Sequence, residues 1–152
     1  MIIMAYTDGG FNKKSGAWAY MFSYGLVNIE ESGSKIETTA QEMEIVAIVK
    51  CLSVIPFIKG ITTIYSDSLY AVNSFNKWML KWIENDWKKS DGKKVVHRLL
   101  FKEALERINK LKDAEMVVRF IHVSGHSGIA GNEYVDSLVK EELVKEEMKA
   151  NY

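Results

Sequence analysis

Four acidic residues occupy positions where a carboxylate is unusual. Asp8 and Asp67 each end a short apolar segment, while Glu44 falls within a largely apolar helical pattern. Asp136 lies early in the last helical pattern of the chain. Each has an ordinary explanation on its own, since strand-end aspartates often cap turns and Glu44 could face solvent at the rim of its helix. A buried ionised carboxylate is nevertheless expensive unless a positive charge compensates it, so the four positions require a common explanation.

The elements that must position these carboxylates follow from the hydrophobic pattern. Short, β-branched or aromatic segments predict strands at 1–8, 17–24, 26–31, 61–67 and 116–123. The third of these strands is expected to continue to Ile36, and a turn is expected over 8–14. Segments with helical periodicity predict a helix body at 41–52 capped by Thr38-Thr39, then helices at 69–76, 78–85, 95–111 and 132–149.

The order of these elements predicts an α/β fold with a mixed sheet. Three sequential strands favour an antiparallel meander, and the alternating helices and strands that follow favour parallel crossovers with helices covering the sheet. The first and fourth strands are then neighbours, which places Asp8 and Asp67 side by side. Two adjacent carboxylates repel each other, and a divalent cation with oxygen ligands relieves that repulsion.

Composition favours one packed domain that spans residues 1–152. The chain is 47% hydrophobic and 26% charged with a formal net charge of zero, which excludes a disordered or fibrous protein. A single cysteine, Cys51, excludes an internal disulfide framework and a cysteine-rich zinc site. The start of the chain lacks the pattern of a secretion signal, and no segment is long and apolar enough to span a bilayer. We therefore expect a monomeric, cytoplasmic protein with no membrane partner.

Four motifs, spread in order over the chain, resemble those of type 1 ribonuclease H. They are YTDGG at 6–10, TTAQEME at 38–44, YSDS at 65–68 and GHSGIAGNEYVD at 125–136. The last of these motifs is the most specific. The resemblance implies a ribonuclease H-like fold with three antiparallel and then two parallel strands. It also implies a hydrolase that cleaves the RNA strand of RNA–DNA hybrids endonucleolytically, leaving 3′-hydroxyl and 5′-phosphate ends.

The same resemblance implies which residues carry the chemistry. The metal-binding and catalytic carboxylates would be Asp8, Glu44, Asp67 and Asp136, with His126 as the catalytic histidine that assists turnover. The implied cofactor is a pair of Mg²⁺ ions, for which Mn²⁺ could substitute. Two such ions roughly 3.5–4 Å apart can activate a water and stabilise the departing oxygen of a phosphodiester. His126 suits proton transfer because histidine titrates near neutral pH.

Charge is distributed unevenly despite the zero total. Segment 77–98 carries a balance of +4 and corresponds to the basic protrusion of bacterial relatives, whereas segment 133–152 carries −3. Such asymmetry suits a protein that binds a phosphate backbone. Tryptophans lie among the lysines of the protrusion, where they could pack on sugars or simply on neighbouring helices. The expected nucleic-acid-binding residues are Gly9, Gly10, Asn12, Thr39, Gln41, Trp78, Lys81, Trp82, Trp87, Lys88, Lys89 and Asn132.

Two other functions remain as alternatives. The first is another nuclease of the same fold, although exonucleases of that group usually begin with Asp-x-Glu where this chain has Asp8-Gly9-Gly10. Transposase-like enzymes normally lack a carboxylate equivalent to Glu44. The second is a non-catalytic hybrid-binding module, whose usual mark would be the loss of one of the four carboxylates.

Overall fold

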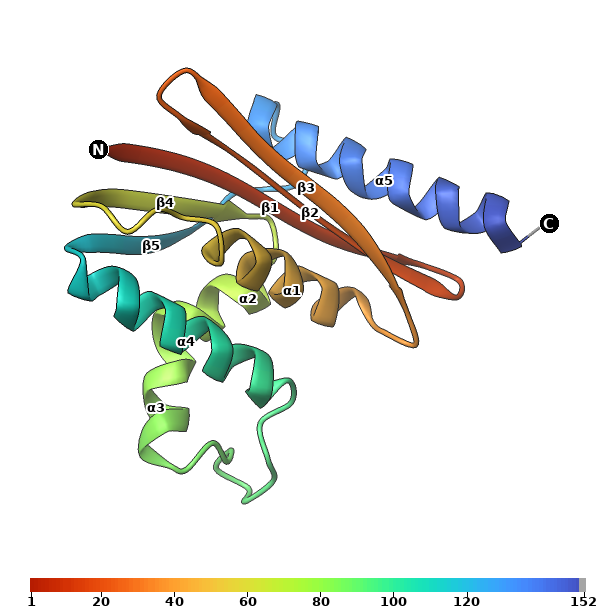
Figure 1. The fold of residues 1–152 in the computed structure, drawn as a ribbon. Helices are drawn as coiled ribbons and strands as arrows, with labels where there is room; N and C mark the ends of the chain where they lie inside the picture. The colour runs from red at the N-terminus through yellow and green to blue at the C-terminus, as the bar shows by residue number, and fades with distance from the viewer. Residues whose placement is uncertain (151–152) are drawn as a thin grey trace.

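A five-stranded mixed sheet forms the centre of the molecule (Figure 1). The computed structural model describes residues 1–150, so the last two residues of the expected 1–152 domain lie outside it. The strands are β1 (Ile2–Asn12), β2 (Ser15–Tyr24), β3 (Val27–Ile36), β4 (Gly60–Ser66) and β5 (Met116–His122). Their spatial order is β3-β2-β1-β4-β5, with β1, β2 and β3 antiparallel and β1, β4 and β5 parallel. The predicted fold class is therefore confirmed.

The first strand is longer than the sequence pattern suggested. The expected turn over 8–14 is wrong, because β1 continues past Asp8 and pairs with β2 as far as Asn12 opposite Ser15. The turn is confined to Lys13 and Lys14, and Lys13 adopts a positive φ of 55°. The glycine pair after Asp8 suggested a turn, but it lies inside a paired strand, and Asp8 is therefore an internal residue of the central strand.

The helices follow the expected order with shifted boundaries. They are α1 (Ala40–Leu52), α2 (Leu69–Asn73), the π-helical turn η1 (Ser74–Trp78), α3 (Met79–Glu84), α4 (Arg98–Asp113) and α5 (Ala130–Ala150). Thr39 caps α1 and its hydroxyl accepts a hydrogen bond from the Glu42 amide at 3.1 Å, as predicted. The two helices expected at 69–76 and 78–85 are continuous, because η1 follows α2 directly and leads directly into α3. The helix expected from residue 95 starts at Arg98, because His97 has a φ of +62° that no α-helix accommodates.

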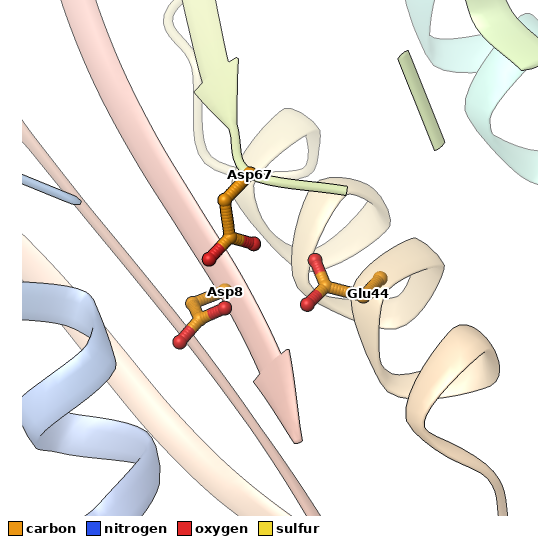
Figure 2. A group of neighbouring side chains, drawn as sticks. All are labelled: Asp8, Glu44 and Asp67. Carbon is orange, nitrogen blue, oxygen red and sulfur yellow. The ribbon is translucent and has the colours of Figure 1, made fainter. Parts of the chain in front are cut away.

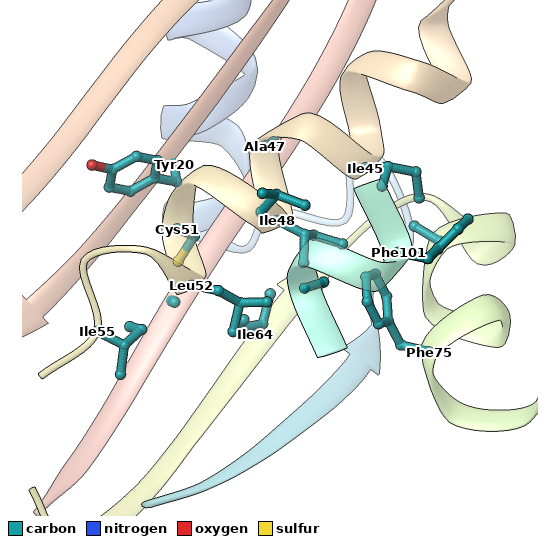
Figure 3. Packing of buried hydrophobic residues seen from close by; sticks show 14 of the residues in the cluster. Tyr20, Ile45, Ala47, Ile48, Cys51, Leu52, Ile55, Ile64, Phe75 and Phe101 are labelled. Atoms are coloured by element: carbon teal, nitrogen blue, oxygen red, sulfur yellow. The ribbon is translucent and has the colours of Figure 1, made fainter. Parts of the chain in front are cut away.

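Alternation along the strands divides the core between the two faces of the sheet. On β2, the bulky side chains Trp18, Tyr20 and Phe22 belong to the large cluster that also contains the apolar residues of α1 and Phe101 of α4 (Figure 3). The small residues Ala17 and Ala19 face the opposite way and pack under α5. Helices therefore cover both faces, with α1 and α4 on one side and α5 on the other (Figure 1). Within residues 1–150, no helix has the length and hydrophobicity needed to cross a membrane.

Candidate active site

Three carboxylates from distant parts of the chain converge where β4 ends beside the middle of β1. Asp8 lies on β1, Glu44 on α1, and Asp67 directly follows β4. Each offers an oxygen, and these oxygens all lie within 4.8 Å of one another. Figure 2 shows the three side chains pointing toward a common centre. The parallel register that pairs Thr7 with Ser66 brings Asp8 and Asp67 together, as the topology predicted.

Glu44 reaches this cluster because α1 packs directly on the backbone of β1. A Cβ atom at Gly9 would lie 2.4 Å from the Glu44 amide nitrogen, so only glycine permits this approach. The Gly9 amide donates a hydrogen bond to Oε1 of Glu44 at 3.1 Å, and the buried Ser66 hydroxyl lies 3.5 Å from Oε2. Gly9, which was expected to contact nucleic acid, therefore also holds the Glu44 side chain through its backbone amide.

Burial and mutual repulsion shift the titration of all three groups. Burial, followed by the negative charge of Asp67, raises the pKa of Asp8 to about 7. Burial and the charge of Asp8 raise the pKa of Glu44 well above its usual range. Burial also raises the pKa of Asp67. The protein therefore holds three carboxyl groups where their ionised forms are disfavoured.

This excess of negative potential fits a divalent cation. Within residues 1–150, no lysine or arginine forms an ion pair with Asp8, Glu44 or Asp67. The donor atoms are all carboxylate oxygens, which Mg²⁺ and Mn²⁺ prefer over the nitrogen and sulfur ligands typical of zinc. The cluster could therefore hold a hard divalent ion, which would compensate the buried charges.

Asp136 lies close to this cluster without belonging to it. Its carboxylate is on α5, and its negative charge contributes to the raised pKa values of both Asp8 and Asp67. It is not among the three carboxylates whose oxygens lie within 4.8 Å of one another. Instead, Oδ2 of Asp136 forms an ion pair of 2.9 Å with Nζ of Lys140, one turn further along the helix. The structure thus brings three of the four predicted carboxylates into contact and places the fourth beside them.

Two histidines lie near the cluster, and only one of them was predicted to act in catalysis. His126 is exposed in the loop between β5 and α5, with a φ of +59°. The loop passes beside the cluster, because a Cβ atom at the adjacent Gly125 would lie 3.5 Å from Oδ2 of Asp67. His122 was expected to have no catalytic role, and its Nε2 lies 3.2 Å from the backbone carbonyl oxygen of Asp67. The β4–β5 register places it opposite Ser66, which is why it lies near the cluster.

A groove of about 600 Å³ separates the start of α1 from segment 77–98. Trp78 and Trp82 line it with ring centroids 6.3 Å apart, while the buried Trp87 packs behind Trp82 with a centroid separation of 6.5 Å. Nζ of Lys102 on α4 lies 5.7 Å from the Trp87 ring. The predicted binding residues that line the groove are Gln41, Trp78, Lys81, Trp82, Lys88 and Lys89. The tryptophans therefore act as packing residues whose outer members also face the groove.

Other predicted binding residues lie outside this groove. The Asn12 side chain donates a hydrogen bond to Glu147 of α5, and Thr39 caps α1 at its exposed start. Gly10 is in contact distance of α5, since a Cβ atom there would lie 3.0 Å from a Val139 methyl group. Asn132 is 3% exposed in the first turn of α5. Apart from the Thr39 cap, which the sequence predicted, these partners and locations were not apparent from the sequence.

Comparison with known proteins agrees with this arrangement. The family model described as RNase H matches residues 2–144. The ribonuclease H of Francisella tularensis subsp. novicida is 37% identical over 145 residues, which cover 94% of this chain and 91% of that protein. The ribonuclease H of Francisella philomiragia subsp. philomiragia is 35% identical with the same coverage.

Solved structures agree at the level of the fold. LC9-RNase H1, a type 1 RNase H with the type 2 active-site motif, has a TM-score of 0.77 at 22% identity and covers 92% of this chain and 71% of its own. The foamy viral protease-reverse transcriptase in complex with an RNA/DNA hybrid has a TM-score of 0.76 at 21% identity, over 92% of this chain and 20% of that one. With the family model spanning nearly all of the sequence, and with curated relatives above 30% identity over their length, this chain belongs to the RNase H family of ribonucleases.

Proposed function

We propose that this protein hydrolyses the RNA strand of RNA–DNA hybrids by metal-dependent endonucleolytic cleavage that leaves 3′-hydroxyl and 5′-phosphate ends. The observation that carries the proposal is the convergence of oxygens from the buried Asp8 and Glu44 and the half-buried Asp67 within 4.8 Å of one another. Asp136 supplies the fourth carboxylate from α5. These four residues would hold two Mg²⁺ ions, with Mn²⁺ as a possible substitute.

The carboxylates and His126 have different roles in the proposed reaction. When bound, the divalent ions supply an activated water and stabilise negative charge on the scissile phosphate and the departing oxygen. Asp8 would be the carboxylate best placed to bind both ions, because it lies on the central strand β1 with Glu44 and Asp67 as its neighbours (Figure 2). His126, on the loop beside Asp67, carries a proton to the departing oxygen of the RNA strand.

Hybrid binding uses the groove between the start of α1 and segment 77–98. Its lysines Lys81, Lys88 and Lys89 are exposed and can contact the phosphates of the DNA strand. The rings of Trp78 and Trp82 offer apolar surface to the sugars. The foamy viral reverse transcriptase of similar fold was solved with an RNA/DNA hybrid, which supports the same substrate class for this chain.

Cleavage of an end-labelled hybrid tests this proposal directly. With Mg²⁺, the protein should cut the RNA strand at internal positions, and a chelator should stop the reaction. Matched duplex DNA and duplex RNA should stay intact, and the products should be substrates for enzymes that require a 3′-hydroxyl or a 5′-phosphate. Tight hybrid binding without a Mg²⁺-dependent product would instead favour a non-catalytic binding module.

A further inference from the structure

Lys140 is the lysine that forms an ion pair with one of the four proposed metal-binding carboxylates. Its Nζ lies 2.9 Å from Oδ2 of Asp136, and both residues face the same side of α5 because they are one turn apart. Asp136 is also the one proposed ligand outside the three-carboxylate cluster. One of the two carboxylate oxygens of Asp136 is therefore engaged by an ammonium group, and Asp136 is not among the three clustered carboxylates.

The other ion pairs of α5 have a different setting. Lys145 pairs with Glu142 at 3.6 Å, and Lys149 pairs with Glu146 at 3.2 Å. Both glutamates also accept hydrogen bonds from serine hydroxyls of β3, so these pairs belong to the contact between α5 and the sheet edge. In the part of the chain that the structure describes, no side-chain hydrogen bond joins the Lys140–Asp136 pair to β3. An exposed ion pair such as Lys140–Asp136 contributes little to helix stability. It differs from the other two pairs because its carboxylate is a proposed metal ligand.

We propose that Lys140 is a positioning residue that holds Asp136 in the metal-free protein and competes with a divalent ion for its carboxylate. The inference rests on the proposed function, in which Asp136 is a metal ligand. Metal binding then requires Asp136 to leave Lys140, and the affinity of the site that includes Asp136 is lowered by the strength of this ion pair. Lys140 thereby sets the metal concentration at which the fourth carboxylate is recruited.

Calorimetric titration of MnCl₂ into the hybrid-free protein at low ionic strength tests this role. Lys140→Gln should bind Mn²⁺ about threefold more tightly than the unmodified protein, because an exposed ion pair of this type is worth up to roughly 1 kcal/mol. Lys140→Arg keeps the charge and should restore the original affinity. The matched control is Lys145→Gln, which removes the same charge from the same helix and should leave the affinity unchanged.

The double variant Asp136→Asn/Lys140→Gln separates a direct tether from general charge repulsion. In the Asp136→Asn background, loss of Lys140 should give no further gain in affinity. An equal gain in both backgrounds, or no gain for Lys140→Gln when the unmodified protein binds Mn²⁺, would overturn the inference. If the unmodified protein binds no Mn²⁺ and cleaves no hybrid, the proposed function itself fails, and the two failures are thus distinguishable.

Discussion

The carboxylate pocket and the groove along segment 77–98 are built in opposite ways. The pocket combines Asp8, Glu44 and Asp67 from three separate elements, and two of these side chains are less than 10% exposed. The groove is formed mainly by one continuous segment whose lysines are exposed around an aromatic cluster. The pocket is therefore fixed by the core of the protein, whereas the groove presents long and adaptable side chains to its ligand.

The energetic cost of holding charged side chains therefore differs between the two regions. The pocket concentrates like charges away from water, which destabilises the metal-free fold but prepares a strong field for a cation. The groove has charges in solvent, where each is nearly free of desolvation cost and sensitive to salt. Changes in the pocket should therefore act on turnover and stability, and changes in the groove should act on substrate affinity and its salt dependence.

The largest expected effect comes from Asp8. The substitution Asp8→Asn should lower the rate of hybrid cleavage by on the order of 10³-fold or more, because it removes the central ligand while preserving shape. The unfolding midpoint of the metal-free protein should not fall, since a repelling charge is also removed. Single-turnover assays and thermal unfolding measure the two outcomes. The exposed Asp113→Asn at the end of α4 is the matched control, and substantial activity of Asp8→Asn would contradict the assignment.

The repulsion in the pocket should also give the metal-free protein an unusual pH dependence. The pKa of Asp8 is about 7 in the fold and near 3.9 in an unfolded chain, so the folded protein holds a proton that the unfolded chain has released. Stability is therefore greatest below about pH 4 for this group and is lost as the pH rises toward 7. Thermal unfolding in chelator should show a midpoint about 5 °C lower at pH 7.5 than at pH 5.

The controls for this prediction use the same measurement. Asp8→Asn should flatten the profile, and Mg²⁺ should restore stability at the higher pH because it compensates the ionised carboxylates. A profile that rises between pH 5 and pH 7.5 in chelator, and that Asp8→Asn does not change, would show that the three groups do not repel one another in solution.

His126 tests whether turnover depends on a group outside the carboxylate pocket. The substitution His126→Ala should slow steady-state cleavage by about 10- to 100-fold, because the departing oxygen loses a proton carrier. Calorimetric titration with Mn²⁺ should give the same affinity as the unmodified protein. His97→Ala, away from the pocket beside Glu42, is the comparison variant. Lost metal binding in His126→Ala would identify the histidine as a ligand instead.

The groove should give the smallest and most salt-dependent effect. Replacing Lys88 and Lys89 with glutamine should raise KM for the hybrid about tenfold at low salt and lower the slope of log KM against log salt by about one per lost phosphate contact. The rate at saturating substrate should change little. The same substitutions at Lys110 and Lys112, on α4, provide a control of equal charge. An unchanged salt slope would exclude these lysines from the binding surface.

The sequence was sufficient for the topology and for the neighbouring positions of Asp8 and Asp67. Strand order follows from the sequence of elements, and the order then forces these two residues together. Local pattern could not reveal that Gly9 serves helix packing, because the clash appears only when α1 lies against β1. For the same reason, the glycine pair was taken for a turn and β1 was predicted four residues too short.

Side-chain partners were the least predictable level of structure. Trp87 was expected to bind nucleic acid, and packing of the tryptophans on neighbouring helices was left open. Asp86 and Trp87 both have positive φ values, and the Trp87 ring is buried behind Trp82. The ion pair between Asp136 and Lys140 fits simple helical spacing, yet its significance depends on which face of α5 meets the pocket. Side-chain burial and ion-pair partners of this kind depend on tertiary packing. The sequence pattern shows only that such contacts are possible.

The central position of β1 has a consequence for folding during synthesis on the ribosome. The strand β1 is synthesised first and can pair with β2 soon afterwards. Its parallel pairing with β4 can form only after β4 has been synthesised. The three-carboxylate cluster cannot assemble before Asp67 has emerged, more than fifty residues after Asp8. Long-range parallel pairing of this kind forms slowly, so the nascent chain contains Asp8 early and completes the three-carboxylate cluster late.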